Sequence, residues 1–372
     1  MQWHLFCRVV DNFGDIGVAW RLACDLAARG ESVRLGVDDA SALGWMAPQG
    51  ADGVEVVGWS DVAPGAADVV VELFGGGRAA SALAPALPPG ASPSNALPPK
   101  GGRGGARVPV LVNVEHLSAE PFVERSHGLP SPGERDGEPP STTWFFYPGF
   151  SAATGGLLRE PGLLERRRAF GRGDDWLASR GIVARADERR VSLFSYRNVA
   201  IPELLDSLAA EPTLLVLMPG AAADQVAASL GTSLARGALR AVPVPRMSQA
   251  DFDRLLWSCD LNLVRGEDSL VRAIWAGAPF VWQLYVQDDG AHVAKLAAFL
   301  DRFLAGAPSG LASALRTLFE RWNGTASAPL PAAMADATTM AAWAAHCRRW
   351  RDALATQDDL AARLLRFVES KR

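Results

Sequence analysis

Short apolar runs alternate with polar or helical segments in the N-terminal part of the chain, and this alternation constrains the fold more than any other feature. The runs are typical of buried strands and cover residues 5–10, 33–37, 54–57, 69–74 and 110–114. Residues 18–29 have helical spacing and stop at Gly30, a common signal for the end of a helix. Strands that alternate with helices predict a parallel, doubly wound sheet.

A second series of the same kind follows. Strands are predicted at 191–194, 214–218, 261–264 and 281–285, helices at 201–209 and 251–259, and a helical tail at 338–369. We therefore predict an α/β protein with two Rossmann-like domains, residues 1–150 and 151–340, and a C-terminal helical segment, residues 341–372. Many α/β proteins share this pattern, so it does not identify a function.

Residues 81–107 differ in composition from both series. They consist mainly of Ala, Pro and Gly and include Gly101-Gly102-Arg103-Gly104-Gly105. A segment of this kind cannot bury enough apolar surface to order itself. We predict a flexible surface insertion that carries no chemistry.

The charge balance narrows the classes of partner. The formal net charge is −4, which argues against a general nucleic-acid or anionic-membrane binder, although a local basic patch is compatible with it. The four cysteines form no CxxC pair, which favours a reducing compartment and offers no zinc framework. No signal peptide and no uninterrupted apolar segment of membrane-spanning length is found, so we expect a cytoplasmic protein.

The loop after the first predicted strand, Asp11 to Gly17, lies where ligands bind in open α/β sheets. It lacks the GxGxxG pattern of dinucleotide sites, and its two carboxylates, Asp11 and Asp15, would repel a pyrophosphate. A carboxylate pair at this position suits proton abstraction or the binding of a cation. The alternative is that Asp15 only caps the helix that follows. Spacing does not decide between the two.

A second cluster, Arg265-Gly266-Glu267-Asp268-Ser269, is predicted as a tight turn between a strand and a helix. Donors at a helix N-terminus beside Arg265 would suit a diphosphate. Glu267 and Asp268 would oppose that anion unless they turn away or accept sugar hydroxyls. The alternative is a capping turn with solvated charges. No histidine pair has metal-site spacing and no serine lies in a GxSxG context, so neither a metal site nor an acyl-transfer triad is indicated.

Four long motifs resemble those of the elongation factor P arginine rhamnosyltransferases. They are residues 11–18; residues 113–120 with 127–132; residues 146–150 with 155–160; and residues 255–257, 265–269 and 279–282 with His292. The resemblance implies a GT-B fold with two facing Rossmann-like domains. It also implies transfer of rhamnose from dTDP-β-L-rhamnose to an arginine of elongation factor P, with inversion and without a metal or other cofactor. The donor would bind mainly the C-terminal domain and the protein acceptor the N-terminal one.

The resemblance also assigns residues. Asp15 matches the proposed general base, Asp11 the other required aspartate of its loop, and Glu267 a residue needed for activity. The matches to donor-binding positions are Phe194, Tyr196, Gln249, Arg265, Asp268 and Ser269. Two positions depart from the family pattern, because Ser248 replaces a proline beside Gln249 and Gln283 stands where many members have histidine.

Two other functions remain open at this point. One is an inverting GT-B enzyme that acts on a lipid or a small glycan. The other is a non-catalytic protein that binds elongation factor P or a nucleotide, although the matches at Asp11, Asp15, Glu267 and Arg265 argue against it.

Overall fold

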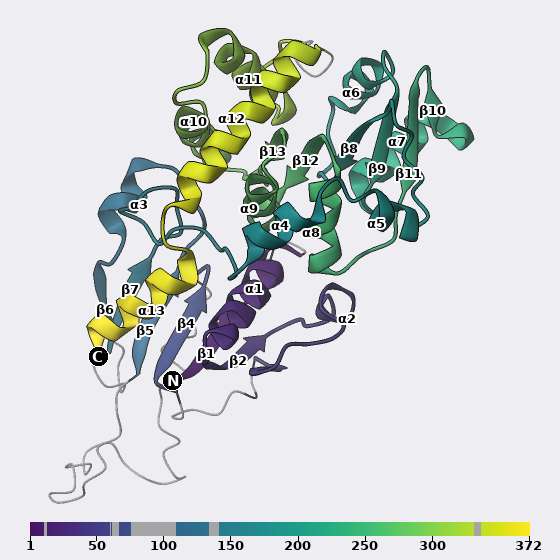
Figure 1. Ribbon diagram of the computed structural model, residues 1–372. Coiled ribbons are helices and arrows are strands. Elements are labelled where there is room, and N and C mark those ends of the chain that lie inside the picture. Colours follow the sequence, from purple (N-terminus) through teal and green to yellow (C-terminus); the bar gives the residue numbers. More distant parts are fainter. Residues whose placement is uncertain (11–12, 60, 62–66, 76–108, 134–140, 331–335) are drawn as a thin grey trace, which may run out of the picture.

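The computed structural model describes residues 1–10, 13–59, 61, 67–75, 109–133, 141–330 and 336–372 (Figure 1). Asp11 and the predicted insertion at 81–107 lie outside the described residues. Within them the helices are α1 Gly14–Ala28, α2 Leu43–Met46, α3 Pro121–Ser126, α4 Leu163–Phe170, α5 Asp174–Ser179, α6 Ile201–Leu208, α7 Ala221–Leu230, α8 Gln249–Ser258, α9 Gly266–Ala276, α10 Ala291–Phe303, α11 Ser309–Trp322, α12 Ala337–Ala355 and α13 Leu360–Lys371.

The N-terminal half is built on a sheet with the strand order β3-β2-β1-β4-β5-β7-β6. Its strands are β1 Gln2–Cys7, β2 Ser32–Val37, β3 Val54–Gly58, β4 Val69–Leu73, β5 Val110–Val114, β6 Pro130–Gly133 and β7 Ser141–Phe146. All neighbours are parallel except β6 and β7. Strands β4 and β5 are buried along their whole length, as expected for a parallel sheet covered on both faces.

The C-terminal half is built on a second sheet, with the order β10-β11-β9-β8-β12-β13. Its strands are β8 Arg189–Leu193, β9 Thr213–Leu217, β10 Ala235–Arg236, β11 Leu239–Pro243, β12 Leu261–Arg265 and β13 Phe280–Gln283. Only β10 and β11 pair in the antiparallel direction. Two parallel-dominated sheets with helices around them confirm the predicted α/β class.

The predicted helical tail consists of two helices, α12 and α13. Helix α12 lies along the C-terminal half, and α13 lies against the N-terminal half (Figure 1). There Phe367 packs on Phe146, with 5.5 Å between the ring centroids, and Leu360 N–H donates to the Leu157 carbonyl over 2.9 Å. The last helix therefore returns to the half in which the chain begins.

The prediction placed the first helix too late. Helix α1 begins at Gly14 rather than Val18, so Asp15 lies in its first turn. A Cβ at Gly17 would lie 3.3 Å from Gln249 Nε2 and 3.5 Å from Asp268 Oδ2. Glycine, which is unfavourable in most helices, is kept here because α1 and the C-terminal half approach each other closely.

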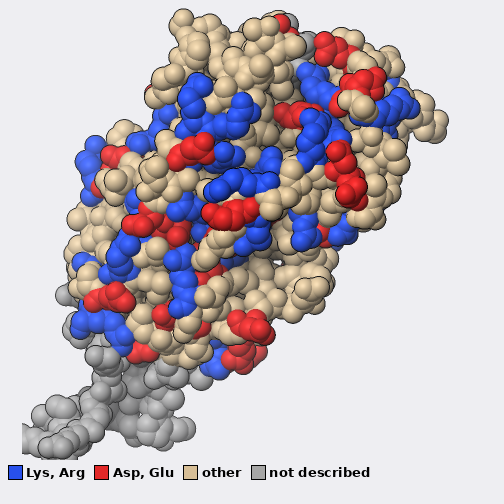
Figure 2. Space-filling model, viewed as in Figure 1, with Lys and Arg blue, Asp and Glu red and all other residues tan. Residues whose placement is uncertain are grey.

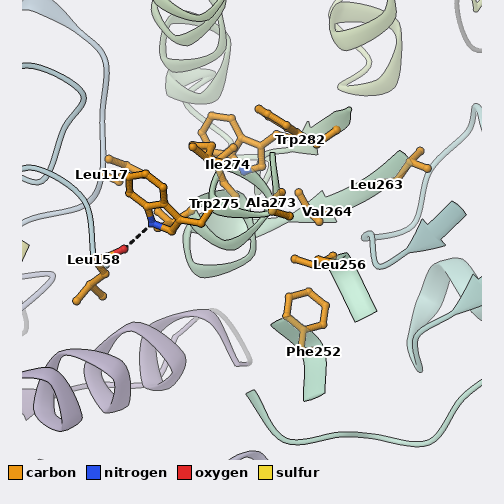
Figure 3. Close-up of a cluster of buried hydrophobic side chains, with 14 of the residues drawn as sticks. Leu117, Leu158, Phe252, Leu256, Leu263, Val264, Ala273, Ile274, Trp275 and Trp282 are labelled. Carbon is orange, nitrogen blue, oxygen red and sulfur yellow. Dashed lines mark hydrogen bonds between the residues drawn. The ribbon is translucent and has the colours of Figure 1, made fainter. Parts of the chain in front are cut away.

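Helix α9 lies between the two halves and is buried on both sides (Figure 3). Its Ile274 and Ala273 belong to the same apolar cluster as Leu263 of the second sheet. On the other side the indole N–H of Trp275 donates to the Leu158 carbonyl over 2.7 Å. The larger of two buried apolar clusters runs through both halves, which fixes the position of α9.

Candidate active site

The predicted site residues gather where the carboxyl ends of the two sheets face each other. In the N-terminal half Asp15 follows β1, and in the C-terminal half the predicted residues follow β8 and β11 or lie at the end of β12 and just after it. Loops at the carboxyl ends of parallel strands are the usual ligand sites of such sheets. Two adjacent cavities open there, and Gly14 and Gly266 line both.

The first cavity, here called the apolar chamber, has aromatic and methionine walls. It is lined by Phe13, Gly14, Trp45, Met46, Phe194, Tyr196, Met218, Met247, Gln249, Phe252, Arg265, Gly266, Asp268 and Ser269. The structure thus brings together all six residues predicted to contact the donor. The Arg265 guanidinium lies 4.6 Å from the Phe194 ring centroid and 4.5 Å from that of Tyr196, which fixes its position by cation–π contacts.

The apolar chamber is narrow in this conformation. Its volume is about 70 Å³. Gln249 Nε2 donates to the Gly17 carbonyl over 3.0 Å and so ties the two halves together beside the chamber. A nucleotide base can therefore enter only if the walls move apart.

The second cavity, here called the polar chamber, has a volume of about 370 Å³. Asp15 and Glu267 both line it, together with Arg8, His116, Tyr285, His292 and Lys295. Asp15 is 7% exposed, and its Oδ2 accepts the Val10 N–H over 2.8 Å. The N-cap of α1 is Phe13, so Asp15 lies in the first turn of the helix rather than at its N-cap.

Glu267 bridges the halves and is fully paired. Its Oε1 accepts from Lys295 Nζ over 2.6 Å and lies 3.4 Å from His116 Nδ1, and its Oε2 accepts the Leu117 N–H over 2.8 Å. Asp268 Oδ1 lies 2.8 Å from Arg21 Nε of helix α1. Lys295 balances the charge of Glu267. Asp268 shares Arg21 with Asp253 and Glu160, so its charge is balanced only in part.

Comparison with known proteins agrees with this geometry. Residues 3–369 match the family model described as "Elongation-Factor P (EF-P) rhamnosyltransferase EarP". The chain belongs to this family. Two relatives are named protein-arginine rhamnosyltransferase: that of Pseudomonas aeruginosa is 43% identical over 98% of this chain and 98% of its own, and that of Pseudomonas putida is 40% identical over 99% and 98%.

A solved structure described as "Structural basis for EarP-mediated arginine glycosylation of translation elongation factor EF-P" matches the fold of this member of the EarP family. Its TM-score is 0.68 at 31% identity, with 100% of this chain and 99% of that chain covered. The predicted GT-B fold is thereby confirmed. The chain is a GT-B glycosyltransferase and a protein-arginine rhamnosyltransferase.

The two departures from the EarP family pattern have structural explanations. Ser248 is the N-cap of α8, and its hydroxyl accepts the Asp251 N–H over 3.2 Å, so the residue that replaces proline still starts the helix. Gln283 is buried, and its Oε1 accepts the Tyr196 N–H over 2.9 Å. It therefore positions the backbone of one aromatic wall of the apolar chamber.

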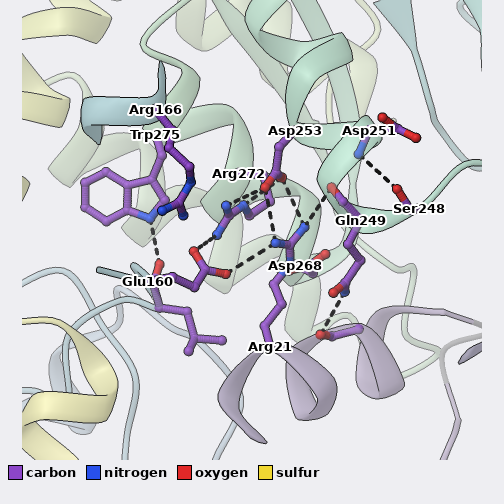
Figure 4. A network of polar contacts seen from close by, with 12 residues as sticks. Arg21, Glu160, Arg166, Ser248, Gln249, Asp251, Asp253, Asp268, Arg272 and Trp275 are labelled. Carbon is purple, nitrogen blue, oxygen red and sulfur yellow. Dashed lines mark hydrogen bonds and ion pairs between the residues drawn. The ribbon is translucent and has the colours of Figure 1, made fainter. Parts of the chain in front are cut away.

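Sequence reasoning missed a buried ionic network beside the site (Figure 4). Arg21 Nη2 lies 3.0 Å from Asp253 Oδ1, and its Nη1 lies 3.3 Å from Glu160 Oε1. Arg272 pairs with the same two acids, at 2.6 Å from Asp253 and 2.7 Å from Glu160. A signal was present, because Arg21 and Arg272 each stand alone within an apolar helical stretch, where a charge needs a buried partner.

Two kinds of feature are absent from the described residues. Within them, no three His, Cys, Asp or Glu side chains are grouped as a metal site requires. No helix in this part of the chain is both long and apolar enough to cross a membrane. A reaction without a metal or other cofactor stays a prediction.

The pairing of Glu267 predicts a pH-dependent contribution to stability. Burial alone would raise the pKa of Glu267, but Lys295 and His116 outweigh burial and lower it from 4.5 to about 2. A carboxylate with a lowered pKa stabilises the fold above its unfolded value and loses this contribution as the pH falls from about 4.5 towards 2. We expect Glu267→Gln to unfold more easily than the wild type at pH 7.

The measurement is urea unfolding of both proteins between pH 7 and pH 3. The difference in their free energy of unfolding should shrink as the pH falls below about 4.5. An equal difference at all pH values would contradict the assignment. Glu165→Gln is the control, because the Glu165 side chain is 67% exposed and forms its ion pair with Arg168 at the surface.

Proposed function

We propose that this enzyme transfers L-rhamnose from dTDP-β-L-rhamnose to an arginine of elongation factor P, with inversion and without a metal ion. One observation carries the proposal: the six predicted donor residues line one chamber, and Asp15 lines the chamber beside it. The family description, which names elongation factor P, supports the acceptor. Because that acceptor is a translation factor, we place the reaction in the cytoplasm.

The donor would occupy the apolar chamber once it widens. Phe194 and Tyr196 offer flat apolar surfaces to the thymine ring, and Gln249 offers an amide to its polar edge. The diphosphate would lie at the N-terminus of α9, where free N–H groups and Ser269 can donate to it. Arg265 would neutralise the charge that develops on the departing dTDP, a role that a metal ion has in other enzymes.

The acceptor guanidinium would enter the polar chamber and lie against Asp15. A guanidinium has a pKa above about 12 and no free lone pair, so it must lose a proton as it attacks. A bond forms from its nitrogen to the anomeric carbon, the bond from that carbon to the diphosphate oxygen breaks, and Asp15 takes the proton. Attack on the face opposite the leaving dTDP inverts the anomeric centre. Asp11, which we assign to the same step, lies outside the described residues.

The decisive assay incubates the purified enzyme with elongation factor P and either dTDP-β-L-rhamnose or UDP-glucose, without and with EDTA. We expect the intact mass of the acceptor to rise by one deoxyhexose unit, on an arginine, with the dTDP sugar only and equally in EDTA. Transfer to lipid or glycan acceptors but not to the protein would favour the lipid or small-glycan alternative. No transfer from any donor would favour the non-catalytic binding protein.

Arg265 offers a sharper test of the donor assignment. Because its guanidinium is held on two aromatic rings, we expect Arg265→Ala to weaken dTDP binding by about 10- to 100-fold, the loss of one charge-assisted contact. Calorimetric titration with dTDP checks this. Arg254→Ala is the control, because Arg254 pairs with Asp251 on α8 and lines neither chamber. Unchanged dTDP affinity in Arg265→Ala would refute the assignment.

A further inference from the structure

A third cavity, of about 470 Å³, lies at the N-terminal ends of strands in the second sheet, whereas the active site lies at their carboxyl ends. Asp260, just before β12, lines this cavity, whereas Arg265 at the end of the same strand lines the apolar chamber. Helix α9 also runs from one site to the other, because it begins at Gly266 and its last residue, Ala276, lines the third cavity. The two sites are therefore separated by the length of one strand and one helix.

Arginines dominate the wall of this cavity, here called the arginine groove. Its charged residues are Arg167, Arg172, Arg189, Arg348 and Arg351, with the acids Glu211 and Asp260. Figure 2 shows many basic side chains, with acidic ones among them, over the region where α4 and α12 lie in Figure 1. In a chain of net charge −4, an excess of positive charge around one cavity is a local feature that favours anions.

Some of this positive charge is balanced within the protein, but not all. Arg172 Nη2 lies 3.7 Å from Asp260 Oδ1, and Arg351 Nη2 lies 2.8 Å from Asp352 Oδ1. Among the described residues, no acid forms an ion pair with Arg167 or Arg348. Burial and then the neighbouring Arg351 lower the pKa of Arg167, as expected where like charges are held together.

Two backbone carbonyls, rather than carboxylates, hold the side chain of Arg167 in place. Arg167 Nε donates to the Ala276 carbonyl over 3.2 Å, and its Nη1 donates to the Gly171 carbonyl over 3.1 Å. Arg351 packs against the backbone of Gly277, where any Cβ would collide with its guanidinium. These contacts fix both guanidinium groups. The charge of Arg167 stays available to a ligand, whereas that of Arg351 is shared with Asp352.

The groove also has an apolar wall. Met340, Ala341 and Ala344 of α12 line it from one side, and Ala278 and Pro279 line it at the start of β13. The volume falls in the range of small-molecule sites, which combine apolar walls with a few placed charges. A ligand that fits both walls carries a phosphate and a compact apolar or aromatic body.

We propose that the arginine groove binds a phosphate-bearing small molecule of mononucleotide size, at a site separate from the active site. Planar guanidinium groups match phosphate oxygens in pairs, and Arg167, Arg348 and Arg351 supply such groups next to the apolar wall. The site does not depend on the function proposed above, because none of its residues lines either chamber.

The test is calorimetric titration of the full chain with sodium pyrophosphate and with AMP. It is made in the Arg265→Ala background, so that the donor chamber lacks its guanidinium. We expect one site for each ligand, tighter for AMP because of the apolar wall. Arg348→Ala with Arg351→Ala should weaken both by about tenfold or more. The matched control is Arg316→Ala with Arg366→Ala, which removes the same charge from exposed ion pairs elsewhere.

Three results would overturn the proposal. The first is unchanged affinity in the groove variant, and the second is an equal loss in the control variant, which would mean an adventitious ion only. The third is binding of a short single-stranded RNA far more tightly than AMP, lost in the groove variant, which would assign the groove to a nucleic acid instead. Circular dichroism of each variant confirms that the fold is intact; alanine in α12 favours the helix.

Discussion

Asp15→Asn should lower the kcat for rhamnose transfer by about 10²- to 10⁴-fold, the usual contribution of a general base. The substitution keeps the size of the side chain and an oxygen that can accept the Val10 N–H, so the loop before α1 keeps its anchor. It removes the ability to take a proton from the guanidinium and the negative charge that attracts this cation, so kcat and the KM for the acceptor are measured separately. Steady-state kinetics on elongation factor P, with the KM values for both substrates, measure the effect.

Asp38→Asn is the matched control for this experiment. Asp38 Oδ1 accepts the Val9 N–H over 2.9 Å, as Asp15 accepts that of Val10, but Asp38 lines neither chamber. We expect it to keep the wild-type kcat. If Asp15→Asn also kept it, Asp15 would not be the base, and a loss confined to the KM for the acceptor would leave it a binding residue only.

Arg272→Met should cost about 3–5 kcal/mol of the free energy of unfolding, the usual result of breaking a buried ion pair from one side. Arg272 is 2% exposed, and its loss leaves Asp253 and Glu160 near each other with only Arg21 to balance them. Methionine fills much of the space, so the cost reflects unbalanced charge more than a cavity. Urea unfolding at pH 7 measures it.

Arg168→Met is the control for the stability experiment. Arg168 forms an ion pair with Glu165 at 3.3 Å, but both side chains are more than two-thirds exposed, at 74% and 67%. Exposed pairs contribute about 0–1 kcal/mol because water competes for them. Similar losses of unfolding free energy in Arg168→Met and Arg272→Met would show that the buried network contributes no more to stability than an exposed ion pair.

The spacing of apolar residues predicted much of the fold, because strands and helices leave a local pattern in the sequence. The strands that lead into the site, β8 and β12, were placed to within two residues, since buried parallel strands are short apolar runs. The start of α1 was missed because Gly14 and Gly17 look unfavourable for a helix. Glycine lowers the stability of a helix, but at position 17 it allows a close contact with Gln249, more than two hundred residues away. No local sequence pattern indicates that contact.

In the candidate site, too, local patterns predicted some features, whereas contacts between distant residues were missed. The position of Asp15 and Arg265 at strand ends followed from polarity and spacing, but their chemistry came from the family resemblance. The pairing of Glu267 with Lys295 and the Leu117 N–H was not predictable, because the partners come from different elements and no spacing rule links them. The buried pair of Arg21 and Asp253 is of the same kind.

Because α13 returns to the first half, the chain passes between the halves twice, once before α4 and once between α12 and α13. The two passages touch: Leu360 N–H bonds to the Leu157 carbonyl, and Arg159 Nη1 donates to the Ala355 carbonyl over 2.7 Å. If the two halves rotate apart to widen the apolar chamber, both passages bend together, because they lie in contact. We therefore expect a hinge rotation about an axis through these two passages, rather than a sliding of one half past the other.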